Sequence, residues 1–214
     1  MNHQLHNHSH SHLNKRIAVL ASGKGSNLEV ILQAMQQGSC DAQVSLVICN
    51  KADANALQIA RAYQVPQVVY LNPKDYADRA AYDQACAALI QQEDCAWVVL
   101  AGYMRILSST FIQTFPQQII NIHPSLLPSF VGAHAVADAL AYGVQITGCT
   151  VHLVTEDLDS GPILAQTAVP VLSTDDHDTL HQRIQNAEYQ LYVQVIQRLV
   201  STPFHVQEKH VIWD

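Results

Sequence analysis

The sequence predicts an α/β fold with a central, mostly parallel sheet, helices on both faces and an antiparallel C-terminal part. In the first half, short apolar runs alternate with longer amphipathic stretches, which is the pattern of a parallel sheet covered on both sides. In the second half, two apolar runs flank a polar turn, which is typical of an antiparallel pair. The 214 residues, 49% hydrophobic and 14% charged, suit one globular domain with a buried core.

The first half contains five candidate strands, each a short, mostly apolar run of the kind found in buried strands. They are residues 16–21, 44–49, 67–70, 97–101 and 119–122. Apolar residues at helical spacing, together with turn and cap residues, predict the intervening helices. These helices are expected over residues 28–38, 54–63, 75–91 and 108–115.

The second half predicts two further helices and an antiparallel strand pair. Residues 133–142 read as a helix that is closed by Gly143, and apolar residues from Leu180 to Leu199 mark a long final helix. The antiparallel strands are expected over residues 145–154 and 162–169, and residues 206–213 are expected to add an edge strand. We therefore predict a single domain over residues 15–214.

Residues 1–14 form a histidine-rich tail that precedes this domain. His3, His6, His8, His10 and His12 alternate with polar residues, and such a pattern cannot build a core. Histidine-rich tracts can capture metal ions, but a flexible tail must first be ordered, so incidental binding is the simpler interpretation. We expect a disordered tail and no metal cofactor.

Charge, signals and cysteines restrict the partners and the compartment. The net charge of −7 disfavours non-specific binding to nucleic acid or anionic membranes. No basic segment with a following apolar run marks a secretory signal, and no stretch approaches the length of a membrane span. The five cysteines are odd in number and none forms a C-x-x-C pair, which indicates reduced, mostly buried thiols. We expect a cytoplasmic protein.

A glycine-rich turn, residues 22–27 (SGKGSN), joins the first expected strand to the first helix. Free backbone N–H groups and the positive end of the helix dipole favour an anion there, and glycines let a phosphate approach closely. Leu28 stands where a dinucleotide fingerprint needs its third glycine, and the spacing differs from that of a nucleoside triphosphate loop. The residues alone leave two interpretations, a phosphate site or a tight turn capped by Ser26 or Asn27.

Asn121 and His123 lie where the last parallel strand ends, just before Pro124. Alternate residues of an extended chain point to the same side, so both side chains can face one pocket. Histidine exchanges a proton near neutral pH, and asparagine can donate a hydrogen bond to a developing oxyanion. The pair therefore indicates a catalytic site at the sheet edge where such folds bind ligands. Asp157 and Asp159 in the later turn are candidates to orient His123, and their spacing does not choose between them.

Five segments together resemble the phosphoribosylglycinamide formyltransferases, the folate-dependent formyl-transfer enzymes of purine synthesis. The segments, which span nearly the whole chain after the tail, are 23–28 (GKGSNL), 50–54 (NKADA), 101–108 (AGYMRILS), 121–128 (NIHPSLLP) and 157–162 (DLDSGP). The histidine–proline segment is common to formyl-folate enzymes, whereas its combination with the G-x-G-S-N loop is much more specific. The resemblance implies a Rossmann-like formyltransferase fold and two substrates, 10-formyltetrahydrofolate and glycinamide ribonucleotide.

The resemblance also implies roles for individual residues. The residues that match the ribonucleotide site are Gly25, Ser26, Asn27, Gln185 and Glu188. The residues that match the folate site are Arg79, Met104, Arg105, Ile106, Leu107 and Asn121. The catalytic trio is matched by Asn121, His123 and Asp159. Without the resemblance, Arg79 would be explained by a surface ion pair, and Glu188 by a solvated helix face. The apolar residues of the run 104–107, which are Met104, Ile106 and Leu107, would be explained by core packing.

Two stretches depart from the common pattern of the family. After the Leu-Leu-Pro segment many relatives carry Pro-Gly-x-His-x-His, and here Val131 and Val136 replace the proline and the second histidine, while His134 is kept. Ser160 stands where a glycine is common. The changes bear on the flexibility of the substrate loops and leave the trio intact.

Four rival functions stay open at this point. A formyltetrahydrofolate hydrolase or a methionyl-tRNA formyltransferase would be expected to carry an additional domain, and a sugar-nucleotide formyltransferase generally differs in the phosphate loop. A non-catalytic phosphate-binding module would explain the glycines but not Asn121, His123 and Asp159. We expect small-molecule substrates, no nucleic acid, no membrane, and a monomer or weak homodimer.

Overall fold

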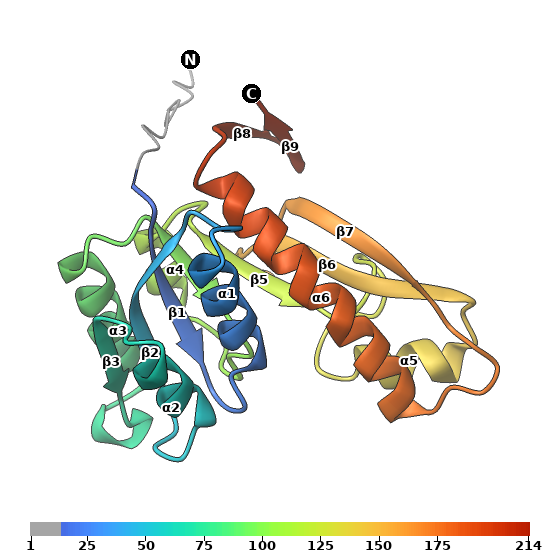
Figure 1. The fold of residues 1–214 in the computed structure, drawn as a ribbon, viewed down its shortest axis with the longest axis horizontal. Helices are drawn as coiled ribbons and strands as arrows, with labels where there is room; N and C mark the ends of the chain where they lie inside the picture. Colours follow the sequence, from blue (N-terminus) through green and yellow to red (C-terminus); the bar gives the residue numbers. More distant parts are fainter. Residues whose placement is uncertain (1–13) are drawn as a thin grey trace.

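The computed structural model describes residues 14–214 and confirms the predicted α/β class (Figure 1). The main sheet is built from β1 (Arg16–Ala21), β2 (Gln43–Cys49), β3 (Gln67–Tyr70), β4 (Trp97–Leu100), β5 (Ile119–His123), β6 (Ile146–Leu153) and β7 (Ile163–Pro170). The prediction of a disordered histidine-rich tail over residues 1–14 concerns residues that lie outside the described range, apart from Asn14.

The seven strands are arranged in the order β3–β2–β1–β4–β5–β6–β7. Strands β1 to β5 pair in parallel with their neighbours, and β6 and β7 continue the sheet in an antiparallel manner. β1 and β4 lie in the middle, and their side chains from Ile17 to Ala21 and from Trp97 to Leu100 are buried. Their apolar character on both faces is what a strand covered on both sides requires.

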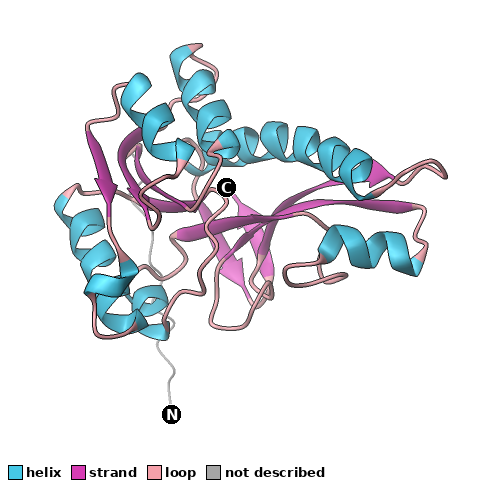
Figure 2. Ribbon diagram, turned by 90° about the horizontal axis from the view of Figure 1, so that it is seen from below, coloured by secondary structure: helices cyan, strands magenta, loops and turns pink. Residues whose placement is uncertain are grey.

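Helices cover both faces of the sheet (Figure 2). One hydrophobic cluster includes side chains of α1 (Ser26–Gln36), α2 (Asn55–Ala62), α5 (Ala135–Tyr142) and α6 (His177–Leu199). A second cluster includes side chains of α3 (Arg79–Gln92) and α4 (Ser109–Thr114). Alternate residues of β1 enter the two clusters, since Val19 belongs to the first and Leu20 to the second.

The antiparallel strands and two helices form an extension beside the parallel strands. In Figure 1, β6 and β7 run away from β5, and α5 and α6 lie along them. The long α6 begins with a capping box in which Asp176 and Thr179 satisfy each other's backbone groups. None of the helices in the described part of the chain combines the length and apolarity that crossing a membrane requires.

The C-terminal prediction was wrong, because residues 206–213 do not form an edge strand of the main sheet. They belong to a hairpin, β8 (Phe204–Gln207) and β9 (His210–Trp213), which forms a separate two-stranded sheet. Glu208 adopts a φ of 58° in the tight turn between them. The Phe204 ring lies 6.0 Å from that of Trp97 and 5.2 Å from that of Trp213, so aromatic packing holds the hairpin against the domain.

Two smaller findings concern the third helix and the thiols. The helix expected from residue 75 begins at Arg79, because Asp78 caps its N-terminus by accepting a hydrogen bond from the Ala81 amide. A short 3₁₀ helix, Pro73–Asp75, precedes it. The five cysteines are free, and all are buried except the half-buried Cys95, as the sequence predicted.

Tyr192 joins α6 to β4 and β5, the two strands that lead into the polar segments 101–108 and 121–128. Its hydroxyl lies 3.0 Å from the Leu100 carbonyl of β4 and 3.2 Å from the Ile120 carbonyl of β5. The side chain is 1% exposed, so the two carbonyls are the partners available to its single hydroxyl hydrogen inside the core. The contact fixes where α6 crosses the ends of β4 and β5.

We expect Tyr192→Phe to lower the free energy of unfolding by about 0.5–1.5 kcal/mol, because it removes a buried hydrogen bond between α6 and the ends of β4 and β5. Urea unfolding followed by circular dichroism measures the change. Tyr189→Phe, on the same helix but half-buried, is the matched control and should change stability by much less. Equal effects of the two substitutions would contradict the role assigned to the Tyr192 hydroxyl.

Candidate active site at the carboxyl ends of the parallel strands

The polar segments singled out in the sequence meet at one edge of the sheet. The glycine-rich loop follows β1, the run 101–108 follows β4, and Asn121 and His123 end β5. Because β1, β4 and β5 are parallel neighbours, their carboxyl ends lie side by side. Ser22 joins the first two loops, since its hydroxyl accepts a hydrogen bond from the Met104 amide at 2.8 Å.

His123 and Asp159 form the centre of the site. His123 Nδ1 lies 3.4 Å from Asp159 Oδ2, and His123 Nε2 lies 2.8 Å from the Phe130 carbonyl oxygen. Both ring nitrogens thus face oxygen atoms that can accept a hydrogen bond. The side chains of His123 and Asp159 are 6% and 8% exposed, so water screens the pair weakly.

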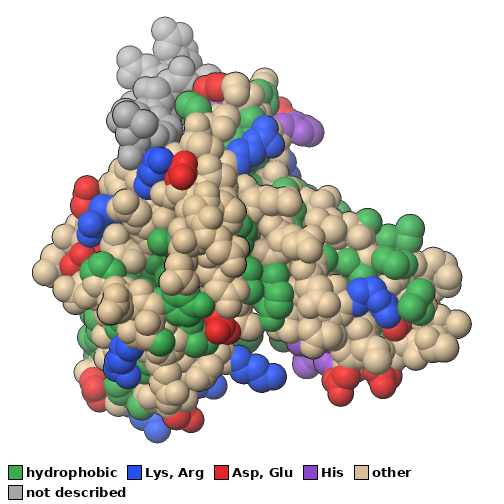
Figure 3. Space-filling model, viewed as in Figure 1, with side chains coloured by type: hydrophobic (Ala, Val, Ile, Leu, Met, Phe, Trp, Pro, Cys, Tyr) green, Lys and Arg blue, Asp and Glu red, His purple; other side chains and the backbone are tan. Residues whose placement is uncertain are grey.

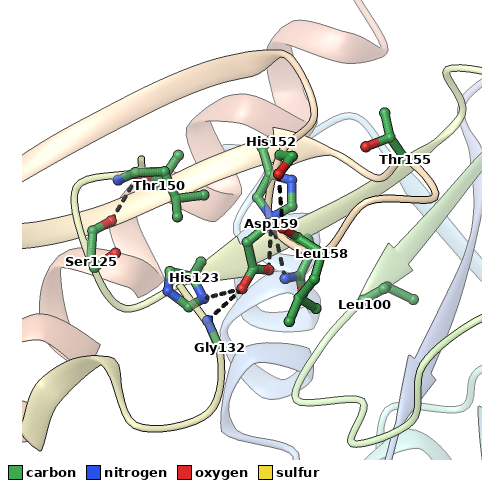
Figure 4. A network of polar contacts seen from close by, with 12 residues as sticks. Leu100, His123, Ser125, Gly132, Thr150, His152, Thr155, Leu158 and Asp159 are labelled. Atoms are coloured by element: carbon green, nitrogen blue, oxygen red, sulfur yellow. Dashed lines mark hydrogen bonds and ion pairs between the residues drawn. The ribbon is translucent and has the colours of Figure 1, made fainter. Parts of the chain in front are cut away.

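The backbone around Asp159 holds its carboxylate toward His123, as Figure 4 shows. Oδ2 of Asp159 accepts a hydrogen bond from the Gly132 amide at 2.9 Å, and Asp159 itself adopts a φ of 50°. Asp157 is exposed and has no such contact to His123 among the described residues. The structure therefore chooses Asp159 from the two candidates that the sequence left open.

His152 is a site residue that sequence reasoning missed. It lies on β6 directly opposite Asn121, and its Nε2 is 3.4 Å from Asn121 Nδ2. The same nitrogen is 3.7 Å from Asp159 Oδ1, and Nδ1 is 2.9 Å from the Leu153 carbonyl oxygen. Burial lowers the pKa of His152 from its ordinary value, so the ring is held neutral. A lone histidine in an apolar strand gave no signal, because only the register of β5 with β6 places it at the site.

Two polar side chains, Thr150 and Gln166, fix the segment that follows His123. Thr150 Oγ1 donates to the Ser125 carbonyl at 2.7 Å and accepts from the Leu127 amide at 3.1 Å. Gln166 Nε2 donates to the Leu127 carbonyl at 2.9 Å, next to the cis Leu127–Pro128 bond. Ser125 and Thr150 appear beside His123 in Figure 4. These hydrogen bonds hold the segment so that the Phe130 carbonyl contacts His123 and the Gly132 amide contacts Asp159.

The glycine-rich loop leads into a helix whose N-terminus no side chain caps. Gly25 is the N-cap of α1 with a φ of 78°, and no side chain caps this helix. A Cβ at Gly25 would lie 2.7 Å from Ala56 Cα, so only glycine lets the starts of α1 and α2 meet. The Asn27 side-chain oxygen is buried without a hydrogen-bond partner among the described residues. The interpretation of a turn capped by Ser26 or Asn27 is therefore wrong.

A cavity of about 310 Å³ opens beside Asp159, the residue that contacts His123. Asn121, His152 and Asp159 line one part of it, and Arg105, Ile106 and Leu107 line another. The remaining walls come from α4, from the end of β6 and from the turn after it. A molecule held here would contact Asn121, His152 and Asp159.

The other residues assigned to the folate site lie outside the cavity wall. Met104 is 76% exposed, and Arg79 is exposed at the first turn of α3. The Arg105 guanidinium lies 4.7 Å from the ring centre of Tyr82, and its Nε is buried without a partner among the described residues. Met104 and Arg79 are therefore accessible to a ligand only where it leaves the cavity.

Gln185 and Glu188 both lie on α6, the helix that packs against α1. Gln185 is half-buried, and Glu188 is 7% exposed. Burial raises the pKa of Glu188 to about 7, so this carboxyl is partly protonated near neutral pH. A solvated helix face, the bland alternative for Glu188, does not fit its burial.

The wider surface and the side-chain chemistry give no sign of a metal centre in the described residues. No group of three or more His, Cys, Asp or Glu side chains within residues 14–214 is placed to hold an ion. Basic and acidic side chains are interspersed over the face seen in Figure 3.

Comparison with known proteins identifies the family to which the chain is similar. A family model described as formyl transferase matches residues 15–196. The phosphoribosylglycinamide formyltransferase of Bacillus subtilis (strain 168) is 40% identical over 187 residues, covering 87% of this chain and 95% of that protein. The trifunctional purine biosynthetic protein adenosine-3 of Homo sapiens is 42% identical over 186 residues, covering 87% of this chain but 18% of that protein.

The fold also matches solved structures over most of its length. Glycinamide ribonucleotide transformylase 1 from Symbiobacterium toebii superposes with a TM-score of 0.89 at 40% sequence identity. The match covers 92% of this chain and 93% of that one. The similarity thus includes both the parallel strands and the antiparallel extension.

We expect Glu188→Gln to stabilise the protein above pH 7 and to have little effect near pH 4.5. The folded-state pKa of about 7 exceeds the ordinary value of 4.5, so stability is lost as pH rises between these values. The difference corresponds to an upper limit of roughly 3 kcal/mol. Chemical unfolding at several pH values measures it, with Glu208→Gln on the exposed hairpin as control. A stability difference that does not vary with pH would contradict the raised pKa.

Proposed function

The chain belongs to the formyl transferase family, and on this premise we propose that it transfers a formyl group from 10-formyltetrahydrofolate to the amine of glycinamide ribonucleotide. The products are formylglycinamide ribonucleotide and tetrahydrofolate. The observation that carries the proposal is that Asn121, His123 and Asp159 lie beside the cavity, at the same sheet edge as the glycine-rich loop. A transfer enzyme needs this arrangement, because donor and acceptor must meet at one point.

In the proposed reaction, the acceptor amine attacks the formyl carbon and forms a new C–N bond. The carbonyl oxygen becomes an oxyanion, which an N–H of Asn121 and the protonated ring of His123 stabilise. The intermediate then collapses, the bond to N10 of the folate breaks, and N10 takes up a proton. The amine loses a proton in the same cycle, and Asp159 with His123 are the groups placed to carry it.

The size of each contribution shows that both substrate sites matter. One preorganised oxyanion donor contributes about 3–4 kcal/mol to lowering an acyl-transfer barrier. Holding two reactants at attack distance contributes up to about 7–11 kcal/mol. The loops that place the folate and the ribonucleotide are therefore as important to the rate as the trio itself.

The folate is proposed to occupy the cavity, with Asn121 near the formyl group. Arg105, Ile106 and Leu107 line the wall, and the buried Arg105 Nε is an unused donor among the described residues. Met104 and Arg79 would contact the part of the folate that emerges, since both are exposed. Arg79 is a cation suited to the carboxylate end of such a molecule.

The ribonucleotide is proposed to bind with its phosphate at the start of α1. The backbone amides of Gly25, Ser26 and Asn27 lie at the uncapped N-terminus, where the helix dipole favours an anion. Gln185 and Glu188 on α6 would hold the sugar or the glycinamide through hydrogen bonds. In this placement the amine lies between the phosphate loop and His123.

The proposal also covers organisation and partners. We propose that residues 15–214 act as a single domain in the cytoplasm, on small-molecule substrates alone, as a monomer or weak homodimer without a metal. A formyltetrahydrofolate hydrolase and a sugar-nucleotide formyltransferase are the alternatives that share the folate chemistry. They differ in the acceptor, which the following assay varies.

We expect tetrahydrofolate to be released from 10-formyltetrahydrofolate only when glycinamide ribonucleotide is present. His123→Ala should lower kcat by about 10²–10³-fold, the usual effect of losing an oxyanion donor. Absorbance measurement of folate release follows both, with the exposed His177→Ala as control. Release without acceptor would identify a hydrolase instead, and no release under either condition would favour a phosphate-binding module.

We expect Gly25→Ala to weaken ribonucleotide binding by about 10- to 100-fold, equivalent to losing a charge-assisted hydrogen bond of about 1.5–3 kcal/mol. The added Cβ would collide with Ala56 and displace the start of α1. Isothermal titration calorimetry with glycinamide ribonucleotide measures the affinity. Gly38→Ala is the matched control, because Gly38 has a φ of 72° but open space around it. Unchanged binding by Gly25→Ala would place the phosphate elsewhere.

A further inference from the structure

We infer that His152 is a positioning residue of the transfer reaction, because it holds the carboxamide of Asn121 with an N–H group directed at the reacting formyl oxygen. The inference rests on the proposed function and deepens it. It assigns a task to a buried polar side chain that neither the sequence motifs nor the trio explain. His152 is 2% exposed and lies opposite Asn121 in the register of β5 with β6.

The hydrogen bonds of His152 determine which ring nitrogen carries the proton. Nδ1 lies 2.9 Å from the Leu153 carbonyl oxygen, which can only accept, so Nδ1 carries the hydrogen. Burial lowers the pKa of the ring and keeps it neutral, so Nε2 has a free lone pair. Nε2 is therefore an acceptor in its 3.4 Å contact with Asn121.

An acceptor at this position decides the orientation of the Asn121 carboxamide. The amide nitrogen has two hydrogens, and one of them is donated to His152 Nε2. The second hydrogen is then fixed in the plane of the amide and can be donated to an oxyanion. If the carboxamide rotated by a half turn, its carbonyl oxygen would face the oxyanion and repel it.

Asp159 and His123 are the other titratable groups that face His152, and they strengthen this assignment. Asp159 Oδ1 lies 3.7 Å from His152 Nε2, beyond hydrogen-bond distance, while Oδ2 contacts His123 and the Gly132 amide. A proton on Nε2 would end its acceptance from Asn121 and attract Asp159 away from His123. A neutral His152 thus keeps Asn121 and Asp159 in their separate tasks, as Figure 4 illustrates for Asp159 between the two rings.

Two substitutions of His152 test the acceptor nitrogen Nε2 separately from the donor nitrogen Nδ1. His152→Asn keeps an N–H group near the position of Nδ1, which can still donate to Leu153, but provides nothing at the position of Nε2. His152→Gln extends far enough to place a carboxamide oxygen near the position of Nε2, where it can accept from Asn121. Unfolding midpoints of both variants report whether the buried site tolerates the change.

We expect His152→Asn to lower kcat by roughly 10- to 100-fold, since misplacement of a reacting group by about 1 Å has an effect of this order. The KM for glycinamide ribonucleotide should stay close to that of the wild type, because the glycine-rich loop is untouched. His152→Gln should recover most of the lost kcat. A purely structural role would instead lower stability and change kcat and KM together.

The double variant with Asn121→Ala gives the sharpest test. If His152 acts through Asn121, adding His152→Asn to Asn121→Ala should change kcat by less than about two-fold, since sites that act as a unit are not additive. A full additional loss of kcat in that background would overturn the inference. An unchanged kcat in His152→Asn alone would also overturn it.

A spectroscopic measurement on the wild type remains decisive even where a variant does not fold. Long-range ¹H–¹⁵N spectra of histidine-labelled protein should show His152 in the Nδ1–H form, with an unprotonated Nε2. The Nε2–H form would overturn the inference. A wild type that transfers no formyl group would contradict the proposed function, whereas the ring spectrum and the variant ratios test the role of His152.

Discussion

The side-by-side position of β1, β4 and β5 is the constraint on which the site depends. Parallel pairing brings three carboxyl ends to one edge, so residues far apart in sequence share a boundary. Tyr192 fixes this edge from α6 by bonding to the Leu100 and Ile120 carbonyls. The positions of the glycine-rich loop, of the cavity wall and of Asn121 and His123 then follow directly from where the strands stop. A change in the pairing of these strands would separate all three at once.

The switch from parallel to antiparallel pairing at β5 completes the site. β6 runs back along β5, which places His152 opposite Asn121 and leads the chain into the turn that carries Asp159. The trio therefore uses one strand end for two residues and a returning loop for the third. His152 lies between them, where a cross-strand neighbour can contact both.

The sequence could predict the fold class and most of this site, because both depend on local patterns. Short apolar runs marked each strand of the main sheet, and the spacing of Asn121 and His123 placed both on one side of β5. Other features depend on contacts distant in sequence. The choice of Asp159 over Asp157 required the backbone φ of the turn and the Gly132 amide, and His152 required the register of β6. The C-terminal hairpin was missed because the Glu208–Lys209 turn has no glycine, and its packing on Trp97 is a tertiary contact.

The departures from the family pattern in the loop after Pro128 can now be interpreted physically. Phe130 and Gly132 contact the catalytic pair through backbone atoms, a carbonyl and an amide, so side-chain changes between them leave both contacts in place. Val131 is 50% exposed, and its replacement of a proline restores backbone freedom without removing a packed side chain. Val136 is 4% exposed within the main hydrophobic cluster, where a histidine would need a polar partner. The loop therefore keeps the geometry of the trio while its side chains serve α5 packing and the surface.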